Sequence, residues 1–158
     1  MPSKITLRTY TPEDFETLYE IDHACYEPAI AYSRRELSTY LRFPGADCVL
    51  AESDARVVGF CLTSRQGPRG HIITIDVLKK FRRHGIGTAL LAEAERRLAS
   101  NAVREVGLET ETSNDSAIAF WQKHGYRSVG VREGYYPGGR DAFSMTKRLP
   151  AASAASLS

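Results

Sequence analysis

The feature that most constrains this chain is a predicted strand, a basic loop with two glycines and a helix, which follow one another over residues 73–91. Residues 73–77 are predicted to form a buried strand, and an amphipathic helix is predicted over 85–100. The first N–H groups of a helix lack partners within the helix, and Gly85 and Gly87 allow close backbone approach. Positive charge comes from Lys79, Lys80, Arg82 and Arg83. The segment therefore predicts a site for a phosphorylated cofactor.

The alternative interpretation of the Arg82-x-x-Gly85-x-Gly87 spacing is an ordinary strand–helix connection in an α/β domain. Two other phosphate-binding motifs are excluded. The chain has no G-x-x-x-x-G-K-[ST] sequence, so it carries no P-loop, and no G-x-G-x-x-G sequence opens a dinucleotide-binding unit.

Several motifs in order then resemble one family. Arg82-x-x-Gly85-x-Gly87 resembles the pyrophosphate loop, [QR]-x-x-G-x-[GA], of the GNAT superfamily of acetyl-CoA-dependent N-acetyltransferases. Residues 108–126 are similar to the L-E-V-x-x-x-N-x-x-A-x-x-x-Y-x-x-x-G-[FY] run of the RimI-type N-α-acetyltransferases. Residues 135–137 and 141–145 also resemble that branch. The resemblance spans residues 4–149 and implies acetyl-CoA as cosubstrate.

Composition fits one soluble domain. The 158 residues are expected to form a single domain over 1–149, with a disordered Ala/Ser tail over 150–158. The net charge of +2 is too small to favour nucleic acid as a partner. The three cysteines, Cys25, Cys48 and Cys61, lack a CxxC pair and fit reduced thiols. With no signal peptide or long apolar run, we expect a cytoplasmic protein that does not enter the membrane.

The expected element order is βααβββαβαββ. Strands are predicted at 5–8, 48–52, 57–63, 70–77, 104–110, 126–132 and 142–149, and helices at 12–25, 33–41, 85–100 and 114–124. This order matches the α/β GNAT fold, a mixed central sheet of about seven strands with about four helices. The resemblance further implies that strands four and five splay apart and that the cofactor lies in the wedge between them.

The resemblance assigns the cofactor contacts. The backbone of the loop would bind the pyrophosphate, through Arg82, Arg83, His84, Gly85, Ile86, Gly87 and Thr88. Ile75 and Val77 would pair with the pantetheine amides as an added strand would. Asn114 would lie near the pantetheine arm, and its alternative role is a helix N-cap. No metal site is expected, since the histidines and cysteines lack metal-ligand spacing.

Glu109 is the predicted general base. Val106 and Leu108 share one face of their strand, so Glu109 points to the other. A carboxylate between apolar strand residues is uncommon unless it is paired or functional, and the alternative is a surface ion pair. Its position matches the glutamate of the L-E-V motif, and proton removal is expected to pass through a water.

Trp121 departs from the family pattern, which places tyrosine there as the general acid for the CoA thiolate. An indole N–H is a hydrogen-bond donor but not a practical acid. Trp121 would then contact the cofactor only, or simply pack in the core. Tyr136, Tyr135 or a water would supply the proton, with Tyr136 taken as the catalytic candidate.

The acceptor is expected to meet Glu27, Tyr32 and Tyr135, which lie in segments that flank the peptide N-terminus in the RimI-type branch. The alternative is that these aromatic residues pin loops to the core. An α-amine near pKa 8 is partly neutral at pH 7.4, unlike lysine, so a lone glutamate favours N-terminal amines of proteins or peptides. A small-molecule amine acetyltransferase and a non-catalytic acyl-CoA-binding module remain alternatives. The protein is expected to be a monomer or a homodimer.

Overall fold

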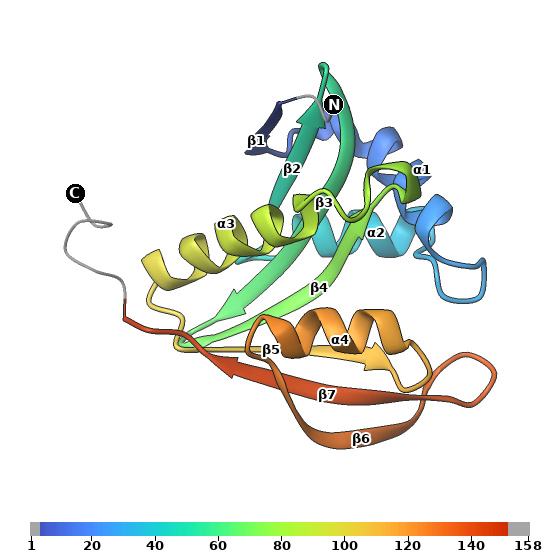
Figure 1. Ribbon diagram of the computed structural model, residues 1–158, viewed down its shortest axis with the longest axis vertical. Helices are drawn as coiled ribbons and strands as arrows, with labels where there is room; N and C mark the ends of the chain where they lie inside the picture. The colour runs from blue at the N-terminus through green and yellow to red at the C-terminus, as the bar shows by residue number, and fades with distance from the viewer. Residues whose placement is uncertain (1–3, 152–158) are drawn as a thin grey trace.

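The computed structural model describes residues 4–151 as a seven-stranded mixed sheet with helices on both faces (Figure 1). The spatial strand order is β1-β2-β3-β4-β5-β7-β6. The strands are β1 Ile5–Thr9, β2 Asp47–Ser53, β3 Arg56–Gln66, β4 Arg69–Val77, β5 Glu105–Glu111, β6 Arg127–Tyr136 and β7 Arg140–Arg148. The helices are α1 Phe15–Cys25, α2 Arg34–Arg42, α3 Ile86–Ser100 and α4 Asp115–Lys123, with short 3-10 turns η1 Pro12–Asp14 and η2 Lys79–Phe81. The expected fold and element order are confirmed.

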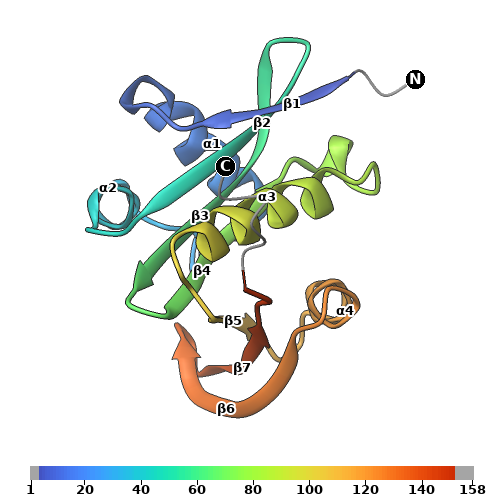
Figure 2. The ribbon, with the colours of Figure 1, turned by 90° about the vertical axis from the view of Figure 1, so that its left-hand side faces the viewer.

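Two cores lie on opposite faces of the sheet. Helices α1 and α2 cover one face, and α3 crosses the other (Figure 2). The first core joins α1 and α2 to β2 and β3 through residues such as Leu18, Leu37 and Phe60. The second joins α3 and α4 to the sheet through residues such as Leu90 and Trp121. Strands β2 and β3 are buried on both faces, which explains their continuous apolar runs.

Capping residues set where the first two helices begin. Ser33 and Glu36 form a capping box at α2, as their spacing indicates. Thr11 and Asp14 form a second box, but the turn that it opens is 3-10, so α1 begins at Phe15 and not at Pro12. The predicted hairpin turn between β2 and β3 is present, with Asp54 and Ala55 in left-handed conformations at φ 52° and 61°.

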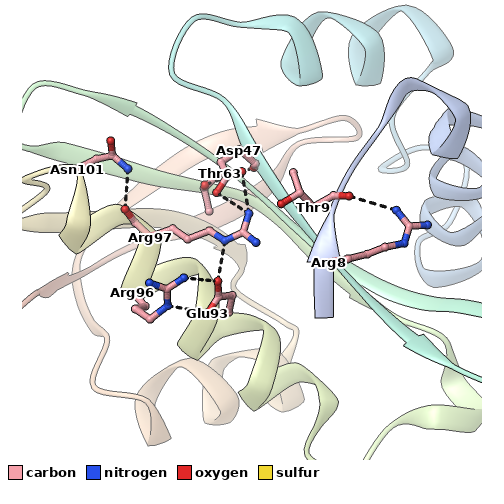
Figure 3. Close-up of polar contacts among 8 residues, drawn as sticks. All are labelled: Arg8, Thr9, Asp47, Thr63, Glu93, Arg96, Arg97 and Asn101. Carbon is pink, nitrogen blue, oxygen red and sulfur yellow. Dashed lines mark hydrogen bonds and ion pairs between the residues drawn. The ribbon is translucent and has the colours of Figure 1, made fainter. Parts of the chain in front are cut away.

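The far end of α3 is tied to the sheet by a polar network (Figure 3). Arg97 bonds Glu93 at 2.8 Å within the helix and Asp47 of β2 at 3.2 Å. Arg96 also bonds Glu93, at 2.7 Å. These contacts join the C-terminal end of α3 to β2.

Strands β4 and β5 separate after a short parallel contact. Only Arg69–His71 pairs with Glu105–Gly107, although both strands continue (Figure 1). The splay that the resemblance implied is therefore present. Leu78 N–H donates to Val58 of β3 at 2.9 Å. Because alternate residues of a strand face opposite edges, the backbone groups of Ile75 and Val77 face the open wedge.

The final hairpin is longer than the sequence indicated. Tyr136 pairs with Arg140 across Gly138 and Gly139, both at positive φ, so β6 runs to Tyr136. Tyr135 therefore lies in a strand and not in the loop where it was expected. The predicted disordered tail lies, from residue 152 onward, outside the described residues. Within residues 4–151, no helix has the length and apolar character needed to cross a membrane.

Candidate active site

The loop before α3 has the backbone shape of an anion site. Arg83 and Gly85 have left-handed φ values of 66° and 79°. Successive N–H groups in such a conformation form a concave nest for an anion, at the positive end of the helix dipole. No acidic residue lies in the first turn of α3, and a Cβ added to Gly85 would meet nothing within 4 Å. The loop therefore has the donors, charge and space that a pyrophosphate needs.

Contacts with β4 and α4 hold this loop in place. Arg82 Nε donates to the Val77 carbonyl at 2.8 Å. A Cβ on Gly87 would lie 3.3 Å from the ring of Phe120, so glycine lets α3 approach α4 closely. Thr88 Oγ1 lies 3.1 Å from His124 Nε2. Other expected cofactor residues differ in exposure: Arg82, Arg83, His84 and Thr88 are exposed, whereas Ile86 is buried, so only its backbone can serve a ligand.

The open edge of β4 meets side chains from the end of α1 and from the segment between α1 and α2. Cys25 Sγ lies 3.5 Å from the Val77 carbonyl, and Tyr26 OH donates to the Ile75 carbonyl at 3.4 Å. Tyr32 OH donates to the Ile73 carbonyl at 3.3 Å. All three bonds are long. The sequence predicted Tyr32 near the site but not Cys25 or Tyr26, which carry no motif.

Glu109 lies on β5 beside the wedge, on the face opposite the α3–α4 core. Its side chain is 12% exposed and its Oε1 accepts a 2.7 Å hydrogen bond from His71 Nε2. Tyr135 OH donates to the same oxygen at 3.3 Å. The structure thus brings Glu109 together with Tyr135 and adds His71.

His71 was missed because its partner is set by strand register. His71 pairs with Gly107 at the last rung of the parallel contact, which places its ring beside the side chain two residues further along β5. Only the β4–β5 register, which no motif reveals, could have indicated this neighbour.

The environment of Glu109 lowers its pKa. Burial acts to raise the pKa, but the hydrogen bond and charge of His71, the charge of Arg132 and the hydroxyl of Tyr135 outweigh it. Glu109 is therefore ionised at neutral pH and can accept a proton.

The two tyrosines of the β6 end remain protonated. Burial, with the neighbouring Glu109 charge, raises the pKa of Tyr135 to about 12. Burial and Tyr135 also raise the pKa of Tyr136 above its ordinary value. The two rings meet edge to face at 4.9 Å between centroids. Both hydroxyls are therefore protonated at neutral pH, and the proton-supplying role of Tyr136 stays a prediction.

Trp121 and Asn114 have contacts that fit their alternative roles. Trp121 is 5% exposed and packs edge to face against Phe120 and Tyr126. Asn114 caps α4, because its side-chain oxygen accepts from Ala117 N–H at 3.1 Å. Contact of either residue with a cofactor stays a prediction.

Glu27 forms an ion pair across the mouth of the wedge. Its carboxylate bonds Arg140 at the start of β7, and Arg140 also lies 3.8 Å from Glu111. An acceptor ammonium that approached Glu27 would have to share or displace this guanidinium. The predicted role of Glu27 in acceptor binding stays a prediction.

The comparisons with known proteins identify the class. The family model described as the Acetyltransferase (GNAT) family matches residues 15–126. An uncharacterized N-acetyltransferase of Methanocaldococcus jannaschii is 35% identical over 145 residues, covering 91% of this chain and 92% of that protein. The chain therefore belongs to the GNAT acetyltransferase family, and it is an N-acetyltransferase.

Relatives with more specific names are similar to this chain in sequence or in fold. An N-alpha-acetyltransferase of Sulfurisphaera tokodaii is 38% identical over 114 residues, covering 63% of this chain and 68% of that protein. The crystal structure of Ard1 from Thermoplasma volcanium matches with a TM-score of 0.84 and 26% identity, covering 92% and 98% of the two chains. The ribosomal-protein-S18-alanine N-acetyltransferase of Escherichia coli shares the fold, with a TM-score of 0.85 at 23% identity over 96% and 97% of the chains.

Proposed function

We propose that the protein transfers acetyl from acetyl-CoA to the N-terminal α-amine of a protein or peptide. The observation that carries the proposal is the ionised Glu109 beside the open wedge, bonded to His71 and Tyr135. The loop nest before α3 supports the choice of cofactor, since it offers N–H donors and basic side chains to a pyrophosphate. Acetyl-CoA supplies the acetyl group as a thioester.

Glu109 acts as the base in this proposal. Its carboxylate takes a proton from the acceptor amine through a water. The amine is then neutral and can attack the thioester carbonyl. A base of lowered pKa is weak, and this fits an α-amine, which is partly neutral near pH 7.4, better than a lysine. Tyr136, or Tyr135, donates the proton that the departing thiolate needs.

Two tyrosines and the named relatives further support this class of acceptor. Tyr32 and Tyr135 come from the two segments that border the wedge on the α1–α2 side, and both hydroxyls lie at the wedge. These hydroxyls offer hydrogen bonds to a peptide backbone. The relatives that are named N-alpha-acetyltransferase point to the same class of acceptor.

The test follows release of free CoA thiol with acetyl-CoA, a panel of N-terminal peptides and a set of small amines. Turnover should require a peptide α-amine, and mass spectrometry should place the acetyl group on it. Turnover on small amines alone would show that the acceptor is a small-molecule amine and not a peptide. Binding of acetyl-CoA without turnover on any amine would favour a binding module.

A further inference from the structure

Two carboxyl groups that the proposed reaction does not use are buried together between α1 and β4. Asp22 is 0% exposed and Asp76 is 1% exposed. The two carboxyls lie near enough for Asp22 to raise the pKa of Asp76. Buried carboxyl groups are rare unless a cation or a set of donors compensates them, so this pair needs a physical explanation.

A β-bulge brings Asp76 to α1. Strict alternation along β4 would place Asp76 on the same face as Ile72, in the α3 core. The register between β3 and β4 shifts between Leu62 and Thr63, and Asp76 then lies opposite Phe60, which belongs to the α1–α2 core. The bulge therefore turns the Asp76 side chain toward α1, where Asp22 is buried.

Each carboxyl has one protein donor and one unsatisfied oxygen. Thr74 Oγ1 donates to Asp76 Oδ1 at 2.5 Å, and Tyr32 N–H donates to Asp22 Oδ2 at 2.8 Å. Asp22 Oδ1 and Asp76 Oδ2 have no donor among the described residues. One proton held between the carboxyls satisfies both oxygens, because an acid O–H on one donates to the carboxylate of the other.

Among the described residues, the ionisable groups around the pair include one positive charge. They are the thiols of Cys25, Cys48 and Cys61, the phenols of Tyr26 and Tyr32, and the guanidinium of Arg82. Arg82 already donates from Nε to Val77. Burial first, and then the bond and charge of Asp22, raise the pKa of Asp76 well above its ordinary range, against the smaller effects of Thr74 and Arg82.

We propose that Asp22 and Asp76 share one proton and act as positioning residues that join the segment 26–32 to the open edge of β4. Asp22 holds the N–H of Tyr32, and His23 Nε2 hydrogen-bonds the Tyr32 carbonyl at 2.8 Å. Both backbone groups of Tyr32 are thus fixed from α1, while its hydroxyl reaches Ile73. The positioning role rests on the proposed function, whereas the shared proton does not.

Infrared spectroscopy of the folded protein tests the shared proton. At about pH 7 ordinary carboxyl groups are ionised, so the wild type should show a carbonyl band of a protonated acid. The band should shift when aspartate is labelled with 13C in its side-chain carboxyl. It should vanish in Asp76→Asn, where the new amide donates to Asp22, and it should shift in Asp22→Asn, where Asp76 stays buried beside an amide. It should persist in Asp47→Asn, which removes a half-exposed carboxyl at the far end of α3.

A wild type without this band, or a band that does not shift with labelled aspartate, would overturn the proposal. A band that survives in both folded single variants would do so as well. If the variants fail to fold, the labelled wild type still decides. None of these readings needs turnover, so a failed assignment of the acceptor leaves them intact.

A pH series tests the positioning role. A raised native pKa means that the folded state binds a proton that the unfolded chain releases, so stability from this pair falls as pH rises from the ordinary carboxyl pKa towards the raised native pKa. As pH rises from about 4, the ordinary carboxyl value, to neutral pH and above, the urea midpoint of the wild type should fall relative to Asp76→Asn. Over the same range the KM for a peptide acceptor should rise in the wild type more than in that variant. Parallel pH profiles would overturn the role.

Discussion

Glu109 and Asp76 are carboxyl groups on the two strands that bound the wedge, yet their neighbours shift their pKa values in opposite directions. Burial is the largest single influence on both and raises both pKa values. His71 and Tyr135 reverse its effect at Glu109, whereas Asp22 reinforces it at Asp76. Because burial acts in the same direction on both carboxyls, the identity of the neighbouring groups accounts for the difference between them.

This contrast separates two tasks. At neutral pH Glu109 is an anion at the open wedge and is ready to accept a proton. Asp76 is enclosed and holds a proton that serves the packing of α1 on β4. Carboxyl groups whose environments push their pKa values apart are typical of sites that divide acid and base roles. Here Glu109 has the proposed catalytic role, and Asp76 has the proposed positioning role.

The largest expected effect comes from removing the charge of Glu109. Glu109→Gln should lower kcat/KM for a peptide by about 10²–10⁴-fold, because a general base is lost. Affinity for acetyl-CoA, measured by calorimetry, should not change. Asp47→Asn serves as the control that removes a carboxylate elsewhere. Equal turnover by Glu109→Gln and the wild type would remove Glu109 as the base.

The second effect concerns what the buried Asp22–Asp76 pair contributes to the stability of the protein. Asp76→Ala should lower the free energy of unfolding by about 1–3 kcal/mol, because Asp22 keeps a buried oxygen without a donor. Asp76→Asn should lose less, since its amide supplies a donor. Urea denaturation at neutral pH measures both. Equal losses in the two variants would show that the donor is irrelevant.

A smaller effect tests the partner of Glu109. His71→Ala removes a strong donor to the carboxylate, so the pKa of Glu109 should rise and the acid limb of kcat/KM should move to higher pH. The stability that the lowered pKa provides is present above the unfolded value and is lost as pH falls, so this variant should also lose less stability in acid. At neutral pH kcat/KM should fall about fivefold, for a loss of about 1 kcal/mol. His71→Gln, which retains a donor, should lie between. An unchanged pH profile would contradict the role of His71.

The smallest effect is expected at Tyr135. Tyr135→Phe removes the longer of the two bonds to Glu109, at 3.3 Å. A long hydrogen bond from a neutral hydroxyl is worth about 0.5 kcal/mol, the low end of the range, so kcat/KM should fall about twofold, with a smaller displacement of the acid limb than in His71→Ala. Steady-state kinetics across pH compares the two. A larger effect than that of His71→Ala would make Tyr135 the dominant partner.

Much of the fold was predictable because its signals are local. Alternation, helical periodicity and the Ser33–Glu36 capping box located the elements to within a few residues. The boundary errors fall where local rules compete, as at Pro12, where the capping box opens a 3-10 turn. The end of β6 extended because pairing with Arg140 held Tyr135 and Tyr136 in the strand.

The site was predictable only in part. The loop glycines, Asn114 and Glu109 belong to motifs, so their places could be expected. His71 and Asp22 could not, because each depends on register across strands or between a helix and a strand. The bulge opposite Leu62 and Thr63 even inverts the face that alternation assigns to Asp76.

The sequence by itself determined the order of the elements, the anion-binding loop and the carboxylate on β5, since spacing along the chain encodes each of them. The tertiary structure alone decided which groups meet that carboxylate and which meet Asp76. A side chain's charge state depends on the few ångströms around it, and those neighbours come from segments that strand register, a bulge and helix packing bring together.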